Sequence, residues 1–200
     1  MPDPPHQLAA LVLAAGGSSR LGAPKQLLQF RGQTLLRRTA EAALSVACHP
    51  VVVVLGAQAD EMMPELNQLS VLTVVNPQWQ RGIGSSIRHG IAPIAASTNV
   101  EACMILLCDQ PLLAAQSLRQ VVGAFEASGK AICAASYGGT IGPPVIASRR
   151  FFPALMALPD DQGAKRLWVD QPDELVTVPL PEAEADIDTA RDWERVTGGP

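Results

Sequence analysis

Residues 8–25 read LAALVLAAGGSSRLGAPK, an unbroken apolar run that passes directly into a loop of small residues. An apolar run without polar alternation predicts a strand that is covered on both faces, as in a parallel sheet. Small residues after such a strand let backbone N–H groups approach a phosphate without side-chain clash. This stretch therefore predicts an α/β protein with a ligand-binding loop at the carboxyl end of its first strand.

The alternation of strands and helices continues along the chain. Further strands are predicted over residues 51–55, 71–75, 102–107, 131–135 and 174–178. Helices are predicted over 35–46, 58–69, 85–94, 114–126, 148–158 and 162–169, with a last helix that Thr189 caps. Residues 138–144, rich in glycine and proline, break the pattern. Apolar strands alternating with helices predict a mostly parallel sheet with helices on both faces, in one domain over residues 1–200 with its core at about 8–195.

Composition excludes several classes of protein. Hydrophobic residues are 48% of the chain and charged residues 17%, which excludes a disordered chain. The net charge of -4 without a Lys/Arg cluster gives no surface for nucleic acid. No apolar run approaches the roughly 18 residues of a membrane helix, and the N-terminus lacks the basic region of a signal peptide. We expect no membrane partner and a cytoplasmic location.

The four cysteines, Cys48, Cys103, Cys108 and Cys133, show no C-x-x-C spacing. Three of them lie in or beside apolar runs. This favours buried free thiols over disulfides.

The loop after the first strand carries two cations, Arg20 and Lys25. Both can neutralise phosphate oxygens, Arg20 in bidentate fashion. The loop is not a Walker A motif, because Lys25 comes two positions late after Gly22 and no Ser or Thr follows it. The dinucleotide-binding pattern G-x-G-x-x-G is also missing. The alternative interpretation is a strand-to-helix turn with two solvated cations.

Carboxylates follow the apolar strands at two places. Asp109 ends the strand over 102–107, where it can hold a magnesium ion or, alternatively, serve as a turn or N-cap residue. Asp186 and Asp188 alternate around Ile187, so on a strand they would share one face and could bind a metal. They could equally cap the helix that begins near Thr189.

Two polar loops are less decisive. Residues 76–86 open a helix and could hold a base or an anion through its N-terminal amides, or could be a packed loop anchored by Trp79. Residues 160–166 combine an acidic turn with basic residues, which is typical of a solvated helix start. The three histidines lack metal-ligand spacing, and no G-x-S-x-G elbow is present.

At this point the motifs resemble one family, the nucleotidyltransferases that include molybdenum cofactor cytidylyltransferase. The signature is Leu13-Ala14-Ala15-Gly16-x-Ser18-x-Arg20-x-Gly22-x-x-Lys25. It is followed in order by Asn76-Pro77-x-Trp79-x-x-Gly82-x-x-Ser85, Leu107-Cys108-Asp109-Gln110-Pro111, Gly142-x-Pro144, Asp161-x-Gly163-Ala164 and Asp186-Ile187-Asp188-Thr189. The resemblance covers residues 8–195. It implies a Rossmann-like three-layer sandwich of the nucleotide-diphospho-sugar transferase type.

The resemblance also implies roles for individual residues. Arg20, Lys25 and Asp109 would be catalytic, the two cations binding the triphosphate. Asp109 and Asp188, with Asp186, would bind Mg²⁺. The nucleotide would be held by Ala14, Ala15, Gly16, Gly17, Ser18, Arg20, Lys25, Asn76, Gly82 and Ser85. Residues 138–164 would face the acceptor.

The implied reaction is transfer of CMP from CTP to molybdenum cofactor, with release of pyrophosphate. The product, molybdopterin cytosine dinucleotide, would pass to a molybdenum hydroxylase such as xanthine or aldehyde dehydrogenase. Ala14-Ala15-Gly16 resembles the cytidylyl branch, since guanylyl-transferring relatives tend to have Ala-Gly-Gly. The acceptor side departs from the family at Pro143, Asp160 and Lys165. The alternatives are a transferase for GTP or another acceptor such as a sugar phosphate, and a non-catalytic cofactor carrier.

Overall fold

The computed structural model describes residues 7–18 and 21–198. Its centre is a seven-stranded sheet with the order β5-β4-β1-β6-β8-β7-β9. The strands are β1 Gln7–Ala14, β4 Val51–Leu55, β5 Leu72–Val75, β6 Val100–Leu107, β7 Ile132–Tyr137, β8 Thr140–Ser148 and β9 Leu175–Pro179. A separate two-stranded ribbon consists of β2 Gln29–Phe30 and β3 Gln33–Thr34.

Seven α-helices are described, along with short 3-10 helices. The α-helices are α1 Leu35–Ser45, α2 Ala59–Met62, α3 Ile83–Ala96, α4 Ala115–Ser128, α5 Phe152–Met156, α6 Lys165–Val169 and α7 Ala190–Thr197. The 3-10 helices are η1 Lys25–Leu27, η2 Met63–Leu66, η3 Trp79–Arg81, η4 Arg149–Phe151, η5 Pro172–Glu174 and η6 Pro181–Glu184. Among the described helices, none is both long and apolar enough to cross a membrane.

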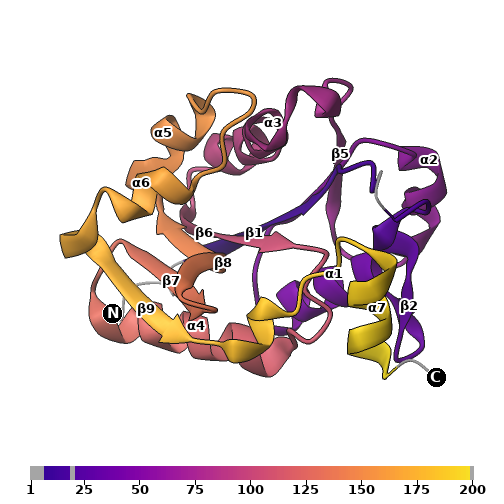
Figure 1. Cartoon of the computed structure of the whole chain (residues 1–200). Coiled ribbons are helices and arrows are strands. Elements are labelled where there is room, and N and C mark those ends of the chain that lie inside the picture. The colour runs from indigo at the N-terminus through magenta and orange to yellow at the C-terminus, as the bar shows by residue number, and fades with distance from the viewer. Residues whose placement is uncertain (1–6, 19–20, 199–200) are drawn as a thin grey trace.

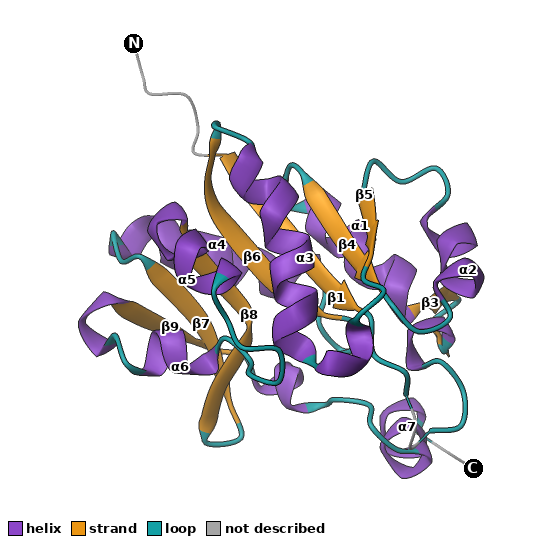
Figure 2. Ribbon diagram, turned by 90° about the horizontal axis from the view of Figure 1, so that it is seen from above, coloured by secondary structure: helices purple, strands orange, loops and turns teal. Residues whose placement is uncertain are grey.

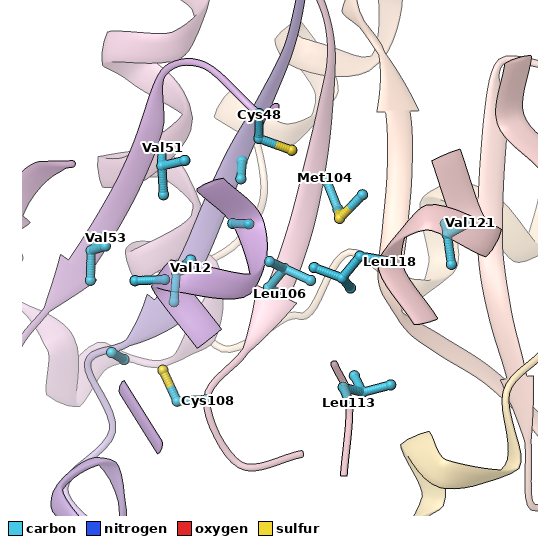
Figure 3. Packing of buried hydrophobic residues seen from close by; sticks show 14 of the residues in the cluster. Val12, Cys48, Val51, Val53, Met104, Leu106, Cys108, Leu113, Leu118 and Val121 are labelled. Atoms are coloured by element: carbon cyan, nitrogen blue, oxygen red, sulfur yellow. The ribbon is translucent and has the colours of Figure 1, made fainter. Parts of the chain in front are cut away.

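The helices form a layer on each face of the sheet, as the sequence predicts. Figures 1 and 2 show α3, α5 and α6 on one face and α1 and α4 on the other. Alternate residues of β1 serve the two faces: Val12 packs in the cluster with Leu36 and Leu118, whereas Leu11 packs with Ile87 and Phe152. Figure 3 shows the first of these clusters, in which the apolar strands are covered by α1 and α4. Continuous apolar strands are therefore explained by burial on both faces.

The sheet is parallel except for β8. Strand β1 pairs in parallel with β4 and β6, and β7 pairs in parallel with β9, whereas β8 is antiparallel to both β6 and β7. The carboxyl ends of β1, β4 and β6 therefore meet at one edge, where a ligand site is expected in such a sheet.

Strand β8 corrects the interpretation of residues 138–144 as a break in the pattern. Gly138 and Gly139 take positive φ angles of 51° and 73° and make the turn of a β7–β8 hairpin. Pro143 and Pro144 lie where the register shifts, since Ala134 pairs with Val145 but Ala135 pairs with Gly142. Proline cannot donate to a ladder and is tolerated at such a bulge, so the strand continues past both residues.

Two other predictions need smaller corrections. The helix expected over 58–69 is the short α2 followed by η2, because Pro64 begins a new turn there. Residues 186–188 belong to no strand; they lie just before α7, which Thr189 caps as predicted, in a capping box with Asp192. Phe30 and Trp193 meet at 6.3 Å between ring centroids, so α7 packs beside the β2–β3 ribbon, as Figure 1 shows.

Candidate active site

A cavity of about 330 Å³ opens at the carboxyl ends of β1 and β6. Its walls come from the loop after β1, from η1, from the segment that opens α3, and from the end of β6. The lining residues are Leu13, Ala15, Gly16, Lys25, Gln26, Trp79, Gln80, Gly82, Ile83, Ser86, Leu107, Cys108 and Asp109. The cavity thus joins the loop after β1 (residues 16–25, the glycine-rich loop), the 76–86 loop and Asp109, which the family resemblance implies to form one site.

Lys25 lies between two carboxylates at this cavity. Its Nζ donates to Oδ2 of Asp109 at 2.7 Å and to Oδ1 of Asp188 at 3.2 Å. The backbone holds the same residues together, because the N–H of Ile187 donates to the carbonyl oxygen of Asp109 at 2.9 Å. Segments that are far apart in the sequence therefore form one charged cluster.

The cluster shifts the pKa values of Lys25 and Asp186. Burial alone would lower the pKa of Lys25, but the charges and hydrogen bonds of Asp109 and Asp188 together outweigh burial and raise it. Burial raises the pKa of Asp186, and the negative charges of Asp109 and Asp188 raise it further. Lys25 is therefore held as an ammonium ion. Asp186 lies close enough to Asp109 and Asp188 for their negative charges to raise its pKa.

One carboxylate oxygen of Asp109 is suited to bind the divalent metal that the family resemblance implies. Its Oδ1 is buried and has no hydrogen-bond partner within the described structure, a costly arrangement for a carboxylate unless a cation binds there. The described residues include no group of three or more His, Cys, Asp or Glu side chains that could hold a metal alone. Mg²⁺ commonly uses one or two carboxylates together with substrate phosphates and water. Asp109 and Asp188 fit this kind of site.

The glycine-rich loop is held by Gln26, a residue that the sequence reasoning missed. Gln26 is buried, and its Nε2 donates to the carbonyl oxygens of Ala14 at 2.9 Å and Gly16 at 2.8 Å. Ser18, with a left-handed φ of 48°, donates through Oγ to Oε1 of Gln26 and accepts from the N–H of Lys25 at 2.9 Å. A polar amide directly after Lys25 and before the apolar Leu27-Leu28 was the available signal.

Trp79, which the sequence suggested as the anchor of the 76–86 loop, also packs against the glycine-rich loop. A Cβ atom on Gly17 would lie 2.9 Å from the Trp79 ring, and one on Gly56 would lie 2.6 Å from Cβ of Trp79. Both positions therefore require glycine for close packing. Trp79 also lines the cavity, so it can contact a bound ligand while it fixes the loop.

Asn76 and Ser85 lie beneath the site. Both are fully buried, and Nδ2 of Asn76 donates to Oγ of Ser85 and of Ser86, each at 3.1 Å. Of these three residues, Ser86 is the one that lines the cavity. Asn76 therefore joins the end of β5 to the start of α3, and its contact with a nucleotide stays a prediction.

The start of α3 is covered by the 158–162 loop. The N–H groups of Gly84 and Ser85 donate to the carbonyl oxygen of Asp160 at 2.9 and 3.3 Å, so these amides are not available to an anion. The Asp160 carboxylate pairs with Arg81 at 2.7 Å and with Arg88. Gly82, with a φ of 127°, lets the chain pass close to this loop.

The structure brings together most of the predicted site. Ala15, Gly16, Lys25, Gly82 and Asp109 line the cavity, and Asp188 joins it through Lys25. Ala14, Gly17 and Ser18 belong to the same loop. Arg20 lies outside the described residues, so its predicted role carries no structural description.

Comparison with known proteins connects this geometry to a family. The model of the MobA-like NTP transferase domain matches residues 10–175. The chain is 30% identical to the purine catabolism protein PucB of Bacillus subtilis over 168 residues, which cover 80% of each protein. It is 34% identical to nicotine blue oxidoreductase of Paenarthrobacter nicotinovorans over 140 residues, 70% of this chain and 66% of that protein, just under two thirds of its length.

Solved structures give the same fold over nearly the whole chain. The crystal structure of Rv0371c from Mycobacterium tuberculosis is similar with a TM-score of 0.78 and 27% identity, covering 97% of this chain and 99% of that one. Rv0371c has also been solved in complex with manganese, with a TM-score of 0.73 and 26% identity, covering 97% of this chain and 100% of that one.

Proposed function

This chain belongs to the family of MobA-like NTP transferase domains, and from that membership we propose that it transfers CMP from CTP to molybdenum cofactor. The products would be molybdopterin cytosine dinucleotide and pyrophosphate. The observation that carries the proposal is the cluster in which Lys25 joins Asp109 and Asp188 at the cavity. It combines a cation for phosphate oxygens with carboxylates for a divalent metal.

The proposed reaction forms one bond and breaks one. A terminal phosphate oxygen of the cofactor attacks the α-phosphorus of CTP, and the bond between the α-phosphorus and the bridging oxygen to the β-phosphate breaks. Phosphoryl transfer depends mainly on positioning and charge neutralisation. Lys25, held as an ammonium ion, would bind triphosphate oxygens, and the amides of residues 15–18 would orient them. Mg²⁺ bound by Asp109 and Asp188 would supply further neutralisation of the developing charge.

Two observations support the choice of base and acceptor. Ala15 lines the cavity, and its methyl group takes space that glycine would leave to a larger base. The name of PucB assigns that relative to purine catabolism, which fits delivery of the product to a molybdenum hydroxylase such as xanthine dehydrogenase. The four buried free thiols fit a cytoplasmic location.

Transfer from GTP, or to another phosphate acceptor such as a sugar phosphate, is the alternative within the same chemistry. Non-catalytic carriage of the cofactor is the alternative outside that chemistry.

A second candidate function is reduction of a dye-like substrate, favoured by the 34% identity to nicotine blue oxidoreductase. The absence of G-x-G-x-x-G from the sequence argues against a dinucleotide-type nicotinamide site. Oxidation of NADH or NADPH in the presence of nicotine blue tests this candidate directly.

The decisive experiment measures pyrophosphate release with Mg²⁺, purified molybdenum cofactor, and CTP or GTP in parallel. We expect release with CTP and little with GTP, and Ala15→Gly should raise the rate with GTP. Release with GTP alone would keep the mechanism and overturn the base assignment. Folded protein that binds CTP and releases no pyrophosphate with molybdenum cofactor would reject the proposed transfer.

A further inference from the structure

Gln26 occupies an unusual place for a polar side chain, because it is 2% exposed and donates to two carbonyl oxygens at the start of the glycine-rich loop, those of Ala14 and Gly16. We propose that Gln26 is the positioning residue of this loop, whose amide determines which peptide groups face the phosphates of the ligand. The inference rests on the proposed function only in so far as the ligand carries a polyphosphate. It assigns a role to a residue that touches no reacting atom.

The geometry of the peptide group gives the reason. In a planar trans peptide the carbonyl of one residue and the N–H of the next point in opposite directions. Gln26 holds the carbonyl oxygens of Ala14 and Gly16 toward its own amide. The N–H groups of Ala15 and Gly17 are therefore turned away from Gln26.

The N–H groups of Gly16, Gly17 and Ser18 remain available to a ligand. No hydrogen bond from the N–H of Gly16, Gly17 or Ser18 is formed within the described part of the chain. Ser18 has a φ of 48°, and a left-handed residue in such a turn helps successive N–H groups to converge on an anion. The loop is thus oriented so that its N–H groups can donate to an anion. A glycine-rich sequence alone does not specify this orientation of the peptide groups.

The same amide also positions Lys25. Oε1 of Gln26 accepts from Oγ of Ser18 at 3.3 Å, and this Oγ accepts from the backbone N–H of Lys25 at 2.9 Å. Both N–H bonds and the oxygen of the Gln26 amide are therefore in use. Because the loop and the lysine are fixed by one buried side chain, loss of the amide should loosen both contacts to a polyphosphate.

Gln26→Met tests the proposal, since methionine keeps the length and bulk of the side chain but has no donor. The probes are inorganic pyrophosphate and CTP, each with Mg²⁺, and their Kd values are measured by titration calorimetry. We expect both Kd values to rise about tenfold, with KM rising similarly and kcat changing little, because the loop binds the phosphates before and during transfer. A side chain that only fills space would leave both Kd values unchanged in the folded variant.

Gln33→Met is the matched control. Gln33 lies in β3 and its Nε2 donates to Oε2 of Glu41 at 2.6 Å, away from the loop. We expect Kd values within about twofold of the wild type for this variant. An equal rise in both variants, or no rise in folded Gln26→Met, would overturn the proposal.

A second variant decides the matter if Gln26→Met does not fold. Ser18→Ala removes the hydroxyl between Gln26 and Lys25, and we expect a rise of about threefold in the Kd for pyrophosphate. An unchanged Kd would overturn the proposal. Wild-type protein that binds both probes but transfers nothing to molybdenum cofactor would reject the proposed function alone. Wild-type protein that binds neither probe would reject both.

Discussion

The ammonium nitrogen of Lys25 lies 2.7 Å from Oδ2 of Asp109, although the two residues are 84 positions apart in the sequence. Oδ1 of Asp188, 163 positions from Lys25, lies 3.2 Å from the same nitrogen. The pair is largely shielded, with side-chain exposures of 17% for Lys25 and 18% for Asp109. Removing either charge should therefore change the stability of the fold and, if the proposed function holds, the rate of transfer.

Lys25→Met should lower the free energy of unfolding by about 1–3 kcal/mol at pH 7, because two carboxylates lose their cation. The pKa of Lys25 is raised above its ordinary value of 10.5, so the stabilisation is fully present below that pH and is lost as pH rises through the folded pKa. Urea denaturation from pH 7 to 11 measures both effects. Lys130→Met, at an exposed lysine that bonds one carbonyl oxygen, should change stability by less than about 0.5 kcal/mol.

Asp109→Asn should reduce the rate of pyrophosphate release by about a hundredfold or more, because the proposed metal would lose its buried ligand. Removal of divalent cations with EDTA should abolish the wild-type rate, and Mg²⁺ or Mn²⁺ should restore it. Electron paramagnetic resonance of Mn²⁺ with CTP present measures metal binding separately from turnover. A variant that keeps the wild-type rate, or wild-type turnover in EDTA, would remove the assigned role of Asp109.

Gly84→Ala should destabilise the protein by about 1–3 kcal/mol through crowding at the start of α3. Its Cβ atom would lie 1.9 Å from the carbonyl oxygen of Pro159 and 2.8 Å from that of Gln162. Gly123 in α4 is the matched control, because a Cβ atom there has no neighbour within 4 Å. Gly123→Ala should stabilise by about 0.4–1 kcal/mol. Thermal unfolding of both variants gives the comparison, and equal stabilities would contradict the close seating of the 158–162 loop.

The thiols should be unreactive in the folded protein at pH 8. Burial raises the pKa of Cys48 to about 12 and that of Cys133 to about 11, and it also raises the pKa values of Cys103 and Cys108. Since the thiolate is the reactive form, labelling with a chromogenic disulfide should be slow until guanidinium exposes all four groups. Rapid labelling of a thiol in native protein would contradict this packing.

Local patterns were enough to predict the framework of the fold. The continuous apolar run of β1 and the motif at Asp109 each carry their information in neighbouring residues. The mostly parallel sheet is confirmed, and a cavity lies at the edge where the ligand is predicted. Strand β8 was not predicted, since Gly142 and two prolines normally interrupt a strand. Pairing with β6 on one side and β7 on the other overrides that preference.

The site could be predicted in its residue types but not in its contacts. The meeting of Lys25 with Asp188, and the support that Gln26 gives to the loop, depend on packing between distant segments. The periodicity of hydrophobic residues in the sequence carries no information about such packing. The amides of Gly84 and Ser85 illustrate the converse, because a helix start that suggests anion binding is occupied by the carbonyl of Asp160.

The hydrogen bond from Ile187 to Asp109, and the contact of Asp188 with Lys25, have a consequence for protein synthesis. A ribosome must pass residue 188 before both carboxylates can be present, and the exit tunnel delays their meeting further. A nascent chain that has already folded β1, β4 and β6 would therefore lack one carboxylate of the proposed metal site. The proposed transfer would therefore begin only after synthesis has passed Asp188.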